Sequence, residues 1–327
     1  MDIPQLLKND GIITDDECQK IEKYEATKLF SVHWELRTIL YAGILLLTSG
    51  IGILVYKNID TIGHQVVLAA IALACIGCFY YCFKNKVSYN NELVENPSPL
   101  FDYIALLGSL LFGTFIGYFQ YQYHLFGNNI WAATLVTGIV FLAGAYLFDH
   151  KGLLSLGITS LASSIGLSIT PLQILQSNNF DSKPLTFSAL VFGLGLAVMA
   201  KVGERERIKA HFGFTYNNFA INLLFCASLA CLFMYDWKPF SFLLIAVICA
   251  YYIKQAIDNQ LFYFMLLSVI YTYIAVTYAI FDFIFYMNWA ETAFGLGFYY
   301  FFATCGGVVY FLIEHKRILN KFYKIKK

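Results

Sequence analysis

The chain has 327 residues, of which 59% are hydrophobic and only 13% are charged, with a net charge of +1. The charged share is about half of that in a typical soluble domain, and the mean hydropathy of +0.62 excludes a water-soluble protein of this size. Repeated apolar runs of about 18 residues or more instead predict an all-α fold, a polytopic transmembrane helix bundle in contact with the lipid bilayer. We expect no nucleic-acid partner.

The first 38 residues are polar and predict a small cytoplasmic helical hairpin. Its second helix begins at the capping box "TDDE", where Thr14 can bond the amide of Glu17 and the Glu17 carboxylate can reach back. Two interpretations remain open for residues 1–38. Capping explains the polar residues without any partner and favours a plain membrane-proximal hairpin, whereas the functional alternative is a docking module for a protein partner.

The apolar runs predict about ten spans within residues 39–313, followed by a basic cytoplasmic tail at 314–327. The predicted spans are 39–56, 65–83, 100–119, 130–148, 152–169, 184–201, 211–235, 239–257, 260–285 and 291–313. The span at 152–169 is rich in Ser, Gly and Thr, which suits close helix packing inside a bundle.

The distribution of Lys and Arg predicts the orientation. With both termini in the cytoplasm, 19 of the 22 basic residues lie on the cytoplasmic side, and only Lys57, Lys183 and Lys238 lie outside. This excess agrees with the positive-inside rule. We therefore expect a multi-pass protein of the cell inner membrane with cytoplasmic N- and C-termini.

The start of the chain resembles a known family. The stretches "LLKNDGIITDDECQKIEKYE" and "YAGILLLTSGIGILVYKNID" are similar to the N-terminal helical hairpin and first span of an uncharacterised bacterial domain-of-unknown-function family of predicted multi-pass membrane proteins. The family's glycines are matched by Gly43 and Gly50, but its Asn-Trp-Asp is replaced by Asn58, Ile59 and Asp60. The resemblance covers roughly residues 4–85 and implies a bacterial inner-membrane protein of unknown activity.

Polar residues at the predicted outer surface are the first group of candidate contacts. The polar stretch around Asn58 and Asp60 predicts the first outer turn between two spans, and a ligand site there is the weaker alternative. Gln120 and Gln122 lie among aromatic residues at the end of the third span. An aromatic belt explains the Tyr and Phe residues, while the amides could hold a sugar or a lipid headgroup.

Three asparagines enter the span that begins near residue 211, and they are the candidates for polar contacts in the interior. Asn218 and Asn222 share a helix face at i and i+4, next to Asn217. Because lipid-facing amides are costly, these side chains should face the bundle. They either join helices, which we favour, or contact a ligand.

Ionisable groups are nearly absent from the middle of the predicted spans, and no catalytic or metal-binding motif is visible. We therefore expect no enzyme activity, no catalytic residues, no cofactor and no metal. The favoured function is a structural or regulatory membrane component with a cytoplasmic docking hairpin. The alternative is a carrier for an uncharged or amphiphilic small molecule, which resembles drug/metabolite carriers in layout only. The oligomeric state does not follow from the sequence.

Overall fold

The computed structural model describes most of the membrane-spanning part of the chain. The described residues are Thr14, Glu17, 33–94, 98–169, 182–235, 237–259, 261–286 and scattered residues between 295 and 314. Its contacts divide the chain into two compact units, Met1–Lys57 and Asn58–Lys327.

The first unit contains most of helix α3 (His33–Ile62). An apolar run without charged residues follows Arg37, and the helix is long and apolar enough to cross a membrane over Leu36–Leu54. The Arg37 guanidinium lies 5.8 Å from the centre of the Tyr41 ring. Such a cation–aromatic pair suits the headgroup region, where Tyr and Arg side chains keep their polar ends in water.

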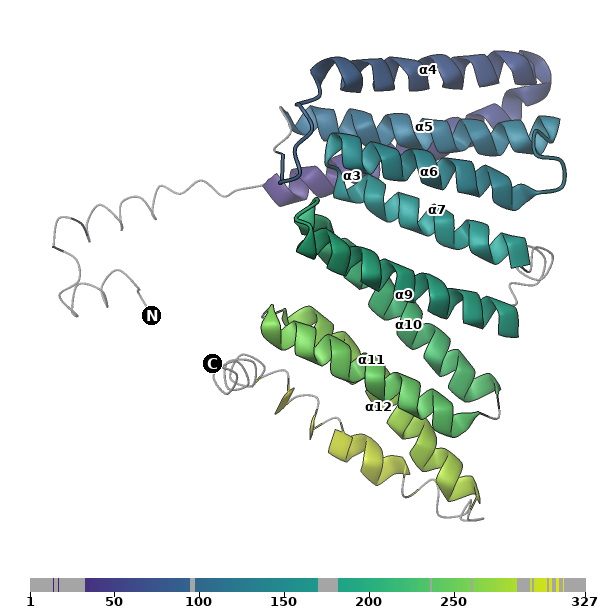
Figure 1. Ribbon diagram of the computed structural model, residues 1–327. Helices are drawn as coiled ribbons and strands as arrows, with labels where there is room; N and C mark the ends of the chain where they lie inside the picture. Colours follow the sequence, from purple (N-terminus) through teal and green to yellow (C-terminus); the bar gives the residue numbers. More distant parts are fainter. Residues whose placement is uncertain are drawn as a thin grey trace. The chain divides into compact units, whose positions relative to one another are not determined.

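The second unit is a series of helices. They are α4 (His64–Asn85), α5 (Pro99–Tyr123), α6 (Ile130–Phe148), α7 (Lys151–Ile169), α9 (Lys183–Arg205), the 3-10 turn η1 (Ala210–Phe212), α10 (Gly213–Met234), α11 (Lys238–Asp258) and α12 (Phe262–Tyr286). Consecutive helices pack as antiparallel pairs, α4 with α5, α6 with α7, α9 with α10 and α11 with α12 (Figure 1). Together with α3, nine helices of the described residues meet the length and hydropathy of a membrane span.

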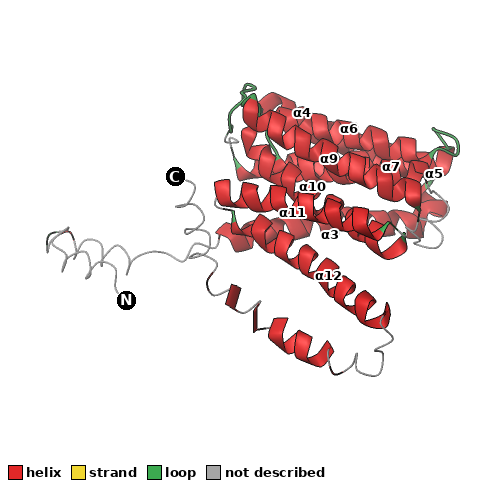
Figure 2. Cartoon of the chain, turned by 60° about the horizontal axis from the view of Figure 1, so that its bottom comes forward, coloured by secondary structure: helices red, strands yellow, loops and turns green. Residues whose placement is uncertain are grey.

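This architecture confirms the predicted all-α, polytopic bundle. In the part of the chain that the structure describes, regular structure is helical throughout, and green loops lie at the two ends of the helices in Figure 2. The observed helices extend several of the predicted spans by a few residues. The predicted tenth span at 291–313 lies largely outside the described residues and stays a prediction.

The first predicted outer turn is shorter than expected. Helix α3 continues through Asn58 and Asp60 to Ile62, and α4 begins at His64. The turn is therefore the single residue Gly63, which has a φ of 85°. Glycine suits this position because side chains with a Cβ rarely adopt positive φ.

The small residues of α7 allow it to approach α6 closely, as the sequence suggested. A Cβ atom added to Gly157 would lie 2.8 Å from Cδ2 and 3.1 Å from the backbone nitrogen of Leu142 on α6. A larger residue at position 157 would therefore require the Leu142 side chain to move and the α6 backbone to shift by a few tenths of an ångström. Close approach through glycine is the usual way in which helices gain packing contacts in a bilayer.

Helix α10 lies at the centre of the second unit. It contacts α7, α9, α11 and α12, and half of its apolar stretch is buried. Phe225 and Leu232 on this helix are fully buried in the main hydrophobic cluster. The most deeply buried polar residues of α10, Asn217 and Ser228, therefore face protein rather than lipid.

Candidate functional site

A cluster of ionisable residues forms where three connections meet at one end of the second unit. The connections are the α4–α5 loop, the α6–α7 turn and the α9–α10 turn. Helix α6 ends at Asp149, which adopts a left-handed conformation with a φ of 54° and donates its N–H to Ala145 O. Asp is among the few residues that tolerate this conformation, so a short turn can present its carboxylate. His150 then caps α7, because its Nδ1 accepts the N–H of Leu153 at 3.2 Å.

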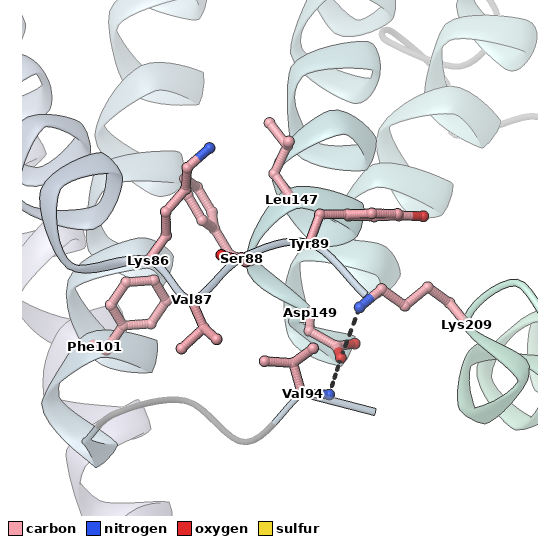
Figure 3. A pocket seen from close by; sticks show the side chains of 10 residues that line it. Lys86, Val87, Ser88, Tyr89, Val94, Phe101, Leu147, Asp149 and Lys209 are labelled. Carbon is pink, nitrogen blue, oxygen red and sulfur yellow. Dashed lines mark hydrogen bonds and ion pairs between the residues drawn. The ribbon is translucent and has the colours of Figure 1, made fainter. Parts of the chain in front are cut away.

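The Asp149 carboxylate is bonded from both neighbouring connections. The Lys209 ammonium lies 2.9 Å from Oδ2, and His211 Nε2 bonds to Oδ1. The backbone N–H of Val94 donates to Oδ2 at 2.7 Å, as Figure 3 shows. The side chains of Asp149 and Lys209 are only 3% and 1% exposed. We call Asp149, Lys209 and His211 the Asp149 cluster.

The α4–α5 loop also holds Lys209 in place. Its backbone N–H donates to Asn91 O at 2.8 Å, and its ammonium donates to Glu92 O at 3.3 Å. The ammonium also lies 5.1 Å from the centre of the Tyr89 ring. A buried ammonium is tolerated only with such partners, so the contacts from the loop offset part of the desolvation free energy of Lys209.

The environment of Asp149 keeps its carboxylate ionised at neutral pH. Burial alone raises the pKa of this group, because it disfavours the charged form. The bonds from the Val94 N–H, Lys209 and His211 outweigh burial, and the pKa of Asp149 lies below its ordinary value of 3.8. Asp149 is therefore a buried negative charge beside Lys209.

The space beside the cluster is too small for a substrate. A hollow lined by Lys86, Tyr89, Phe101 and other residues adjoins Asp149 and Lys209, with a volume of about 10 Å³ (Figure 3). A volume of roughly 10–15 Å³ is the least that a water molecule needs. The cluster thus connects three segments of the protein and leaves no room for a ligand.

The predicted pair Asn218 and Asn222 joins two helices. Asn218 Oδ1 accepts the Tyr263 hydroxyl at 2.7 Å, and Asn222 Oδ1 accepts the Tyr271 hydroxyl at 2.7 Å. Both tyrosines belong to α12. Asn222 Nδ2 also donates to Asn218 O at 2.7 Å, within α10. Both amide oxygens are therefore used between helices, and a ligand role for this pair stays a prediction.

Asn217 has a different environment from its two neighbours. Its side chain is 2% exposed, and its Oδ1 has no hydrogen-bond partner among the described residues. The same holds for the buried hydroxyl of Tyr252 and for Gln255 Oε1 on α11. An unsatisfied buried oxygen costs free energy, which distinguishes Asn217 from the two bonded asparagines.

The candidates near the outer surface do not gather into one site. Gln120 is only 6% exposed, because α5 continues past it to Tyr123. Its Nε2 donates to Gly127 O at 2.7 Å, and its Oε1 accepts the N–H of Phe126 at 2.8 Å. The structure thus corrects the expectation of a surface contact at Gln120, whose amide instead fixes the following loop.

The other outer candidates are less informative. Gln122 is half-buried near the end of α5. The backbone of Asn58 and Asp60 belongs to the last turns of α3, while their side chains lie outside the described part. Surface contacts at these three positions stay predictions.

An apolar groove of about 630 Å³ lies between α7, α9 and α10. Its lining includes Ile165, Leu185, Phe192, Leu223 and Ala227. A second apolar groove of about 470 Å³ lies on α11 and α12. Volumes of about 300–1,000 Å³ are typical of small-molecule sites.

Within the described residues, no group of three or more His, Cys, Asp or Glu side chains is arranged to hold a metal ion.

Sequence reasoning missed the Asp149 cluster. Asp149 and Lys209 are 60 residues apart, and each is an ordinary polar residue of a short connection between spans. The one available signal was their common side of the membrane in the predicted topology. That signal places several charged residues at one surface and does not select which of them pair.

The family comparison agrees with the resemblance found in the sequence. Residues 5–154 match the sequence model of a family described as "Predicted membrane protein (DUF2157)", which confirms the similarity to an uncharacterised family of membrane proteins. Comparison with curated proteins and with solved structures gave no match.

Proposed function

We propose that this membrane protein is a structural or regulatory component of the cell inner membrane, without enzyme activity, that docks a protein partner through residues 1–38. One observation carries the proposal. The Asp149 cluster and the pair Asn218 and Asn222 are bonded to neighbouring protein groups, as in Asp149 with Lys209 and Asn222 with Tyr271. Groups used in this way stabilise a bundle and are not presented to a substrate.

The pair Thr14 and Glu17 supports the helical character of the proposed docking segment. Glu17 Oε2 accepts the Thr14 backbone N–H at 2.9 Å and the Thr14 hydroxyl at 2.8 Å. The backbone bond and then the hydroxyl bond lower the pKa of Glu17. The bond from the Thr14 N–H to the Glu17 carboxylate is one half of a capping box, a motif that marks the start of a helix.

Photo-crosslinking in cells tests the docking proposal. A photoreactive amino acid placed at several positions in 18–30 should form discrete protein adducts, whereas the same residue at the exposed Asn128, in a loop of the second unit, serves as the control. Deleting residues 1–30 should leave the protein inserted, because no span is lost. The proposal would be contradicted if positions 18–30 and position 128 gave the same set of adducts, or if the deletion variant failed to insert into the membrane.

We further propose that both termini are cytoplasmic. The structure places Lys84, Lys151 and Arg205 near the same end of the helices as the Asp149 cluster, while Lys183 and Lys238 begin α9 and α11 at the opposite end. In a variant without the eight native cysteines, an impermeant thiol reagent should label Asn58→Cys in intact cells. It should label Arg205→Cys only after the membrane is opened, and labelling of Arg205→Cys in intact cells would overturn this orientation.

A carrier for an amphiphilic small molecule is the second candidate, and the groove between α7, α9 and α10 favours it. Saturable flux of an amphiphilic dye into protein-containing vesicles would support this function. Ala189→Phe, which places a large side chain into the groove, should then abolish the flux, whereas Val191→Phe on an exposed face of the same helix should not. Flux that is equal with and without protein would leave the structural or regulatory function as the better one.

A further inference from the structure

The groove between α7, α9 and α10 has an apolar interior. Its length follows the outer half of α9 in the proposed topology, from Leu185 to Phe192, and Ala162 to Leu167 form the α7 wall. Three hydroxyl groups line it, but each already donates to a carbonyl of its own helix: Ser163 to Thr159 O, Ser188 to Leu185 O and Thr186 to Ser182 O. The interior therefore has no unused hydroxyl donor that a polar ligand would be needed to satisfy.

A cation, Lys183, lies beside one end of the groove. Thr186 lines the groove, and its Oγ1 lies 3.5 Å from the Tyr235 hydroxyl at the end of α10. The Lys183 ammonium lies 5.4 Å from the centre of the same Tyr235 ring. Lys183 is exposed and precedes Thr186 by one helical turn, so its ammonium is available beside the apolar interior.

These two features together point to a phospholipid. The helices that form the groove are long and apolar enough to span a membrane, so the molecules that surround them are lipids. An acyl chain matches the interior, which offers apolar surface and no free polar group. A phosphodiester matches the rim, because the exposed Lys183 ammonium can donate charge-assisted hydrogen bonds to phosphate oxygens.

We propose that this groove binds one phospholipid, with an acyl chain between α7, α9 and α10 and its phosphate at Lys183. The lipid is a resident ligand and not a transported one, so the proposal goes beyond the structural or regulatory function and does not depend on it. In the proposed orientation, this lipid belongs to the outer leaflet. Its role would be to complete the packing of α9 against α7.

A photoactivatable phospholipid, with a diazirine on its acyl chain, tests the proposal in vesicles that contain the full-length protein. After illumination, mass spectrometry should find adducts on groove residues such as Ala162 and Ala227, and excess unlabelled phospholipid should compete for them. Ala189→Phe should abolish these adducts, and Lys183→Gln should reduce them several-fold. Val191→Phe, on the exposed face of α9, should leave them unchanged.

Three outcomes would overturn the proposal. Equal labelling of the groove and of the exposed face around Val191 would mean that only bulk lipid is present. If neither Ala189→Phe nor Lys183→Gln reduces the yield of adducts, the lipid is not bound at this groove and rim. A native mass spectrum in which wild type is a dimer and Ala189→Phe is a monomer would show that a second copy fills the groove. Lys183→Gln changes an exposed side chain, so it keeps the test valid if Ala189→Phe does not fold.

Discussion

Two Lys–Asp pairs lie at opposite ends of the second unit and differ mainly in burial. Lys209 and Asp149 are 2.9 Å apart and almost completely buried, whereas Lys238 and Asp282 are 2.7 Å apart with both side chains 40% exposed. Water reaches both side chains of the exposed pair, and holding two side chains together costs entropy, so such a pair adds little stability. In the buried pair, each charge depends on its partner because neither can reach water.

The largest expected effect comes from removing one partner of the buried pair. Lys209→Met leaves the Asp149 carboxylate buried without its ammonium, and we expect the free energy of unfolding in detergent to fall by about 3–5 kcal/mol. The additional change Asp149→Asn should recover most of this loss, because it removes the charge and keeps an acceptor for the Val94 N–H. Thermal unfolding of both variants measures the loss and its recovery. If Lys209→Met is as stable as wild type, the buried pair does not contribute to stability in the way proposed.

Acid should weaken the buried pair at a predictable pH. The pKa of folded Asp149 lies below its ordinary value of 3.8, so the folded state binds this proton less readily than the unfolded state. The contribution of Asp149 to stability is therefore complete above pH 3.8 and is lost as the pH falls through the lower, folded pKa. Melting temperatures measured from neutral pH downward should show this loss in wild type and a smaller one in Asp149→Asn. Identical acid profiles would contradict the assignment.

The three asparagines of α10 allow a comparison of the same kind among neutral groups. Asn218→Leu and Asn222→Leu each remove an interhelical hydrogen bond, which in membranes contributes about 0.6 kcal/mol on average and at most about 1.7 kcal/mol. Asn217→Leu removes a buried oxygen without a partner in the described residues, so stability should stay the same or rise. Melting temperatures of the three variants decide this. An equal loss in Asn217→Leu would reveal a partner for that oxygen.

The smallest effect is expected at the exposed pair. Lys238→Met removes the ammonium that lies 2.7 Å from Asp282, but both side chains can be solvated, and we expect no measurable change in melting temperature. The same substitution type at Lys209 is the matched comparison. A large loss in Lys238→Met would mean that the bilayer surface shields this pair from water and that the contrast between the two ends is wrong.

Part of this architecture was predictable from local sequence. The long apolar runs led to helices at the observed places, and prolines lie near the starts of α5, α9 and α11. Proline suits the first turn of a helix because its missing N–H has no partner there. The exact turn at Gly63 was harder to predict, because the polar residues before it also fit a helix end in the headgroup region.

The candidate residues show where local reasoning stops. The spacing of Asn218 and Asn222 predicted that both side chains face the bundle, since positions four apart share a helix face. It did not predict that Tyr263 and Tyr271 on α12 would be their partners. Gln120 was expected at a surface. It is buried because the loop at 124–129 folds back over it, and the sequence did not predict the path of that loop.

The sequence by itself determined that this protein is a helical membrane protein, because each apolar run must satisfy its own backbone hydrogen bonds within a helix to exist in lipid. Its basic residues also predicted an orientation, since that rule depends only on where charges fall along the chain. The tertiary structure alone decided that Asp149 pairs with Lys209 and that three helices enclose an apolar groove. Both features depend on which helices become neighbours, and that is set by the packing of side chains that are far apart in the sequence.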